Sequence, residues 1–145
     1  MHNQRVQFIE ALMAASQRHV EVALRSAEQA VDLWRQSSED AALRTAASVA
    51  IGELQTTVEQ HFARLAGEGL LEDAVSASPQ LYPKLRELEE WQTSLADRAA
   101  EIVAQMKLVS TTADANELTK SLKRFRAELL REEQQEREII DRGLH

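Results

Sequence analysis

The chain has 145 residues and carries 17 basic and 24 acidic side chains, which gives a net charge of −7. This length suits a single domain spanning residues 1–145, and the acidic balance argues against a protein that binds nucleic acid or an anionic membrane. The sequence has no cysteine, which excludes disulfides, iron–sulfur clusters and thiolate zinc sites.

Glycine and proline are scarce, with four and two residues respectively, and the composition is typical of long helices. We therefore expect an all-α fold. The first helix is predicted from about Gln4 to Trp34, because apolar residues recur there at three- and four-residue steps. Its predicted inward stripe contains Phe8, Leu12, Ala15, His19, Ala23, Ala27 and Val31.

The second helix follows the stretch RQSSED, whose serines are predicted to cap it. It ends where Gly67 and Gly69 loosen the chain, and we expect a short irregular turn after it. Its predicted inward stripe contains Leu43, Ala47, Ala50, Leu54, Val58, His61 and Leu65.

The third helix is predicted to open at Ser78 and Pro79, because proline favours the first helical position. Asp114 and Glu117 have the spacing of a capping box and are predicted to open the fourth helix. The third stripe contains Leu81, Leu85, Leu88, Trp91, Leu95, Ala99, Ile102 and Met106. The fourth contains Leu118, Leu122, Phe125, Leu129, Glu132, Glu136, Ile139 and Gly143.

The short connections on either side of the second helix force its neighbours to run antiparallel to it. The predicted architecture is an antiparallel up-down-up-down four-helix bundle. A long coiled-coil hairpin is the rival, but it requires strict seven-residue apolar patterning, and polar residues interrupt these stripes.

The polar residues that interrupt the apolar stripes form the candidate site. His19, His61, Glu132 and Glu136 all lie on predicted inward stripes, on three different helices. Burying such groups is unfavourable unless they are paired or bound to metal, so these four residues are the candidate metal ligands. The alternative is that the histidines are hydrogen-bonded core residues and that the glutamates pair with nearby arginines on a solvated face.

Two runs, HFARLAGEGLLEDAVSASPQLYPKLRELEEWQTSL and LKRFRAELLREEQQEREIIDRG, resemble the bacterial hemerythrin-like family. The similarity covers residues 56–143. The resemblance implies a hemerythrin-like four-helix bundle that holds two irons between its helices through histidines and bridging carboxylates.

The match to the family's ligands is incomplete. His61 occupies the place of the second-helix histidine, but Leu65 stands where the family has a bridging carboxylate. Trp91 replaces the third-helix histidine, and Glu132 with Glu133 replaces the histidine–glutamate pair of the fourth helix. We expect Trp91 and Leu65 to fill space that ligands and metals occupy in the family.

Three functional hypotheses stay open. The favoured one is a non-enzymatic binding or interaction module whose di-iron site is largely lost and which has no cofactor. The second is an altered iron-binding protein that uses the remaining histidines and glutamates, and the third is a helical adaptor that binds a protein partner or forms a homodimer. The amino terminus lacks the pattern of a signal peptide and no stretch has the length of a membrane span, so we expect a cytoplasmic protein.

Overall fold

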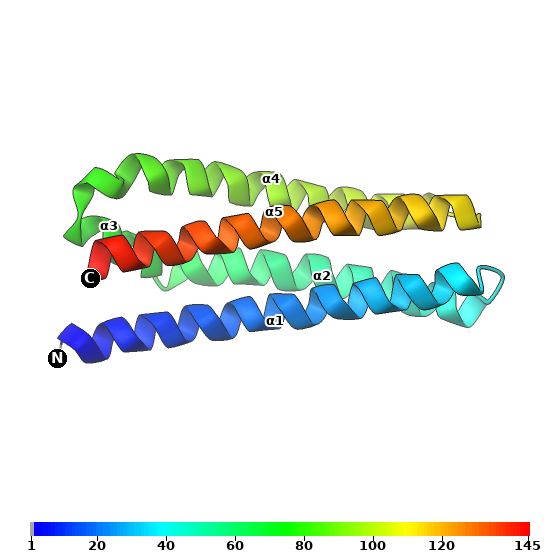
Figure 1. The fold of residues 1–145 in the computed structure, drawn as a ribbon, viewed down its shortest axis with the longest axis horizontal. Coiled ribbons are helices and arrows are strands. Elements are labelled where there is room, and N and C mark those ends of the chain that lie inside the picture. The colour runs from blue at the N-terminus through cyan, green and yellow to red at the C-terminus, as the bar shows by residue number, and fades with distance from the viewer. Residues whose placement is uncertain (1) are drawn as a thin grey trace.

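The computed structural model describes residues 2–145, which form five α-helices and one short 3-10 helix, with no strand among them. Four helices are long: α1 (His2–Gln36), α2 (Ala41–Gly67), α4 (Tyr82–Leu108) and α5 (Thr112–Leu144). They lie alongside one another, and consecutive long helices run in opposite directions (Figure 1). Both α1 and α4 pack against α2 and α5. The predicted all-α class is confirmed, and the helices pack as a bundle.

The segment between α2 and α4 is helical, whereas an irregular turn was predicted. Gly69 has a φ of 63°, a left-handed conformation that favours glycine, and it separates α2 from α3 (Leu70–Ala77). The short helix η1 (Pro79–Leu81) then leads into α4. Four apolar side chains of α3 are buried, and α3 packs against α5, so tertiary burial makes this eight-residue segment helical.

The helix caps differ from those predicted. The side chain of Asp40, and not a serine, accepts hydrogen bonds from two backbone amides at the start of α2. At the start of α5, Thr111 Oγ1 accepts from the Asp114 amide at 3.1 Å, and Asp114 Oδ2 accepts from the Ser110 amide at 3.2 Å. The capping side chains are thus Thr111 and Asp114, three residues earlier than the predicted pair Asp114 and Glu117. Ser78 makes no side-chain cap at its helix.

The core is divided along the bundle into two apolar clusters. The loop-end cluster lies toward the α1–α2 and α4–α5 connections. It contains Val20, Leu24, Ala27, Val31, Trp34, Ala47, Ile51, Leu54, Val58, Leu95, Ala99, Ile102, Met106, Val109, Ala115, Leu118, Leu122, Phe125 and Leu129. The terminal cluster lies beside α3 and the chain ends. It contains Ile9, Met13, Leu65, Leu70, Leu71, Ala74, Val75, Leu81, Leu85, Leu88, Ile139 and Ile140.

Between the two clusters lies a layer of buried polar side chains. We call it the polar layer, and its members are Ser16, Gln17, His61, Glu132, Glu133 and Glu136. On each contributing helix these residues fall between the last residue of one apolar cluster and the first of the other. The fold therefore places its buried polar groups together, at one level of the bundle.

The predicted inward face of α1 is wrong over its first two-thirds. Phe8 is 63% exposed and His19 is also exposed, whereas Ile9, Met13 and Val20 face the core. The packed face of α1 is thus rotated away from the predicted stripe. The predicted stripes of α2, α4 and α5 are confirmed at most positions, including His61, Glu132 and Glu136.

Trp91 and Leu65 lie in different surroundings. Leu65 is buried in the terminal cluster. Trp91 is half-buried against the loop-end cluster, and the Arg131 guanidinium lies 5.5 Å from its ring centroid. The indole therefore covers the edge of the core and is only partly enclosed by it.

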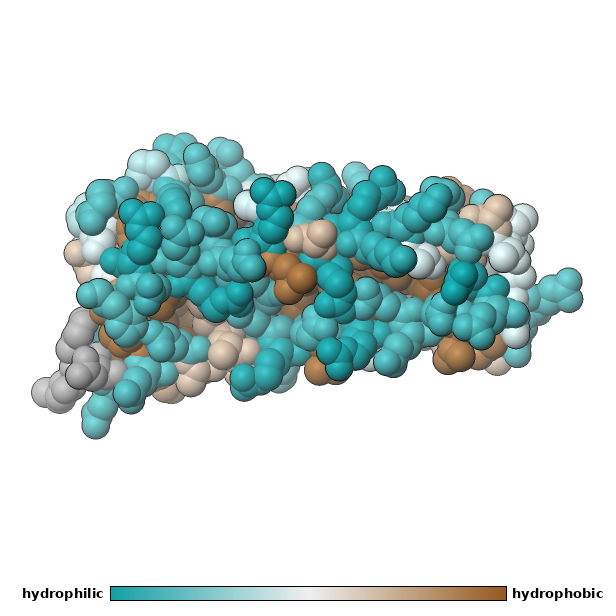
Figure 2. Space-filling model, viewed as in Figure 1, coloured by the Kyte–Doolittle hydropathy of each residue, from teal (hydrophilic) through white to brown (hydrophobic). Residues whose placement is uncertain are grey.

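The face shown in Figure 2 is mostly hydrophilic, and apolar side chains are scattered over it. Within residues 2–145, no helix combines the length and the apolar character needed to cross a membrane.

Candidate metal centre

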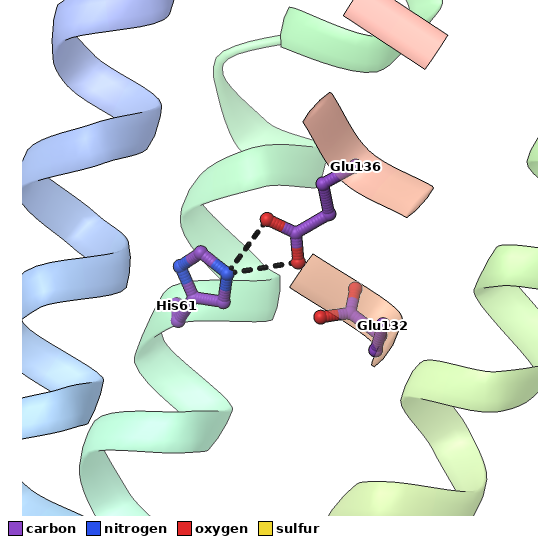
Figure 3. A group of neighbouring side chains, drawn as sticks. All are labelled: His61, Glu132 and Glu136. Atoms are coloured by element: carbon purple, nitrogen blue, oxygen red, sulfur yellow. Dashed lines mark hydrogen bonds and ion pairs between the residues drawn. The ribbon is translucent and has the colours of Figure 1, made fainter. Parts of the chain in front are cut away.

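Three of the four candidate ligands converge in the polar layer. His61 extends from α2, and Glu132 and Glu136 extend from α5 (Figure 3). One ligand atom from each of the three residues lies within 4.8 Å of the others. All three side chains are at most 2% exposed.

The helix geometry explains the convergence. Glu132 and Glu136 are four residues apart, so they lie one above the other on the same face of α5. Helices α2 and α5 each pack against α1 and α4, which makes them diagonal partners in the bundle. Their inward side chains therefore meet at the bundle centre, where His61 faces both carboxyl groups.

Both nitrogens of the His61 ring have partners. Nε2 lies 3.1 Å from Oε1 and 2.9 Å from Oε2 of Glu136, and Nδ1 lies 2.6 Å from the Ser16 hydroxyl. When Nδ1 carries the proton and donates to Ser16, the lone pair of Nε2 faces Glu136 and can bind a metal ion in place of that hydrogen bond. Burial lowers the pKa of His61, which favours the neutral ring that metal binding requires.

Glu136 is supported from α1. Gln17 Nε2 donates to Glu136 Oε1 at 3.0 Å and to the backbone oxygen of Glu133 at 3.3 Å. Arg137 Nη1 in turn donates to Gln17 Oε1 at 2.9 Å. This chain of hydrogen bonds fixes the orientation of the Glu136 carboxyl group and connects it to the surface.

Glu132 is only partly satisfied. Its Oε2 accepts a hydrogen bond from Gln92 Nε2 of α4 at 3.2 Å. Its Oε1 is buried and has no hydrogen-bond partner among the residues that the structure describes. Burial, and next the neighbouring Glu136, raise the pKa of Glu132 to about 10, so this carboxyl group holds a proton at neutral pH in the metal-free protein.

The other carboxyl groups of the layer are also shifted. Burial raises the pKa of Glu136 to about 7 and that of Glu133 to about 7. Glu133 belongs to the polar layer but lies outside the group of converging ligand atoms. The alternative in which Glu132 and Glu136 pair with arginines on a solvated face is wrong, because both side chains are fully buried.

His19 lies outside the cluster. It is exposed and lines a shallow groove between α1 and α2. The helical pattern places His19 among the candidate ligands only because the predicted face of α1 is wrong. The same error concealed Ser16 and Gln17, which lie three and four residues after buried Met13 and therefore share its face.

The donor set fits one metal ion. One imidazole and two carboxyl groups are ligands that zinc, iron(II) and manganese(II) accept. Metal–ligand bonds of about 2.0–2.2 Å place neighbouring donor atoms roughly 3–4 Å apart, so the observed cluster needs only a small contraction. The Glu132 oxygen that has no hydrogen-bond partner becomes a donor when the metal ion displaces the proton of this carboxyl group. Three donors are too few for a carboxylate-bridged pair of ions.

Comparison with protein-family models, with curated proteins and with solved structures found no match to this chain. The arguments for function therefore come from the geometry of the polar layer.

Proposed function

We propose that this chain is a helical-bundle protein that binds one divalent transition-metal ion through His61, Glu132 and Glu136. The observation that carries the proposal is the buried, unpartnered Oε1 of Glu132 within a cluster of three converging donors. An unsatisfied buried polar atom costs about 1–3 kcal/mol. A bound cation would remove that cost, and it would displace the proton that burial otherwise keeps on Glu132.

We also propose that the bundle is a hemerythrin-like, up-down-up-down four-helix bundle in which the two-iron site of that family is reduced to a single-ion site. The resemblance over residues 56–143 supports this, as do the places of His61 and Glu136. Leu65 and Trp91 account for the reduction, because neither a leucine nor an indole can supply the missing ligands.

The role that follows is metal-dependent binding. A bound iron or zinc ion would supply Lewis-acid character at the centre of the bundle, and iron would add a redox couple. The residues of the chain hold the donors in place: Ser16 holds the His61 ring, Gln17 orients Glu136, and Gln92 orients Glu132. We therefore choose the iron-binding alternative over a site that has been wholly lost.

A second candidate is a metal-free binding or interaction module. The observation in its favour is that His61 and Glu136 already hydrogen-bond to each other, so part of the cluster is satisfied without an ion. In this candidate Glu132 stays protonated, and the polar layer serves only to select one arrangement of the helices.

Metal stoichiometry separates the two candidates. The purified protein would be stripped with a chelator, incubated with iron(II) without oxygen or with zinc(II), passed through a desalting column and assayed for metal. Single-site binding predicts about one ion per chain. The variants H61A and E132Q should each lose most of it.

Two matched controls test the ligand assignment. H19A removes the other candidate histidine, and E133Q alters the neighbouring buried carboxyl group, and both variants should keep the parent's stoichiometry. A parent protein that retains almost no metal would overturn the single-ion proposal and favour the metal-free module. Equal losses in H61A and H19A would show that the binding is not at this cluster.

A further inference from the structure

A groove of about 630 Å³ lies between α1 and α5, beside the polar layer. Met13, Ala14 and Ile140 provide apolar lining, and three acidic side chains, Glu10, Glu138 and Asp141, also border it. Gln17 and Arg137 belong to the same lining. Glu10 pairs with His145, and Glu138 pairs with Lys84 and Arg142, so Asp141 is the one lining carboxylate without a salt bridge among the described residues. The groove therefore combines one carboxylate that can attract a cation with a direct contact to the candidate site.

Gln17 is the residue shared by the groove and the site. It lines the groove, it is only 9% exposed, and its amide nitrogen lies 3.0 Å from Glu136 Oε1. A cation that moves inward from the groove reaches the Gln17 side chain before it reaches Glu136. Displacing that one side chain would open the polar layer to the groove.

Arg137 determines which end of the Gln17 amide faces inward. Its Nη1 donates to Gln17 Oε1, so the amide oxygen points toward the arginine and the amide NH₂ points toward Glu136. The NH₂ group carries partial positive charge and opposes an incoming cation. The reverse orientation would present the amide oxygen to the site, but it would set the NH₂ group against the guanidinium.

We infer that this groove is the route by which a hydrated divalent cation reaches His61, Glu132 and Glu136. The Gln17 side chain blocks the route, and its hydrogen bond with Arg137 holds it in the blocking position. The inference rests on the proposed function. It assigns Gln17 and Arg137 to the control of the rate of metal uptake and leaves the ligand set unchanged. Asp141 raises the local concentration of the cation in the groove, so uptake slows as salt is added.

The test is the rate at which cobalt(II) enters the metal-free protein, followed by stopped-flow absorption of the bound ion. R137Q and Q17A should each bind cobalt faster than the parent by about threefold or more. R137Q removes the guanidinium that holds Gln17 in place, and Q17A removes the side chain that blocks the route. A14F, which fills the groove, should bind about tenfold more slowly, and A14L should be intermediate. D141N should slow uptake and weaken its dependence on salt.

The control is A23F, which adds the same bulk to the separate groove between α1 and α2 and should bind at the parent's rate. Circular dichroism melts identify any variant that is misfolded, and A14L then replaces A14F. If the parent binds cobalt but A14F and A14L bind at its rate, the inferred route is overturned and the metal site stands. If the parent binds no cobalt, the proposed function fails as well.

Discussion

Two consecutive parts of one helix face show how the core is built. On α5, Leu118, Leu122, Phe125 and Leu129 are at most 1% exposed, and one turn further along the same face Glu132 and Glu136 are equally buried. The helical period thus selects which residues are buried. It does not determine whether burial stabilises the protein.

The two parts differ in what burial does to the free energy. Burying a leucine or phenylalanine side chain stabilises the fold by about 1.5–3 kcal/mol. Burying a carboxyl group is unfavourable unless it gains a partner, a proton or a cation, and the polar layer supplies these unequally. The comparison therefore predicts opposite responses when the two parts are mutated.

The largest effect is expected in the loop-end cluster. Phe125→Ala should lower the free energy of unfolding by about 3–5 kcal/mol, because it leaves a cavity among fully buried neighbours. Urea denaturation measures this change. Leu130→Ala, at a partly exposed position on the same helix, should cost much less. Similar losses in the two variants would contradict the described packing of α5.

At Glu132, one turn further along α5, a substitution is expected to increase the free energy of unfolding. Glu132→Leu should raise the free energy of unfolding of the metal-free protein by about 1–3 kcal/mol, because it removes the unpartnered buried oxygen. The same variant should lose metal binding. Glu90→Leu, at an exposed position on α4, is the control and should leave both quantities almost unchanged. A Glu132→Leu variant that is less stable than the metal-free parent would show that this carboxyl group is satisfied.

The buried carboxyl groups of the polar layer should also make the stability of the protein depend on pH, which the apolar clusters do not. Glu133 and Glu136 have pKa values raised to about 7 and Glu132 has one raised to about 10, so the folded protein binds more protons than the unfolded chain. Their contribution is fully present below the unfolded pKa of about 4.5 and is lost as pH rises through the folded values, by up to about 1.4 kcal/mol per pH unit for each proton.

His61 acts in the other direction, because its pKa is lowered and its contribution is lost as pH falls below about 6.5. Above that pH the carboxyl groups act alone. The metal-free protein should therefore lose stability between about pH 7 and 9, as urea midpoints will show, and Glu132→Gln should flatten the loss. Stability that rises with pH over this range would refute the assigned protonation states.

The smallest effect is expected at the helix cap beyond the loop-end cluster. Thr111→Ala should cost about 1 kcal/mol, because Thr111 accepts a hydrogen bond from a backbone amide that begins α5. The loss should be the same with and without zinc, since the cap lies far along the helix from the polar layer. Thr111→Ser should recover most of the stability. A loss that depends on zinc would link the cap to the metal site.

The all-α class and the inward faces of α2, α4 and α5 could be predicted from the amino-acid pattern alone. Each of these helices has one dominant apolar stripe, so its period allows one way to bury it. His61, Glu132 and Glu136 lie on those stripes, and their burial could be predicted for that reason. The burial of Glu133 and the hydrogen bond from Gln92 to Glu132 could not, because Gln92 and Glu133 each lie one residue away from a predicted inward position.

The inward face of α1, by contrast, depends on how the helices pack together. This helix carries two apolar sets one residue apart, one with Phe8 and Leu12 and one with Ile9 and Met13, and the helical period fits both. Only simultaneous packing against α2 and α5 selects the second set. That choice turns His19 outward and brings Ser16 and Gln17 against the site, because on a helix a rotation of one residue, about 100°, changes which side chains reach the core.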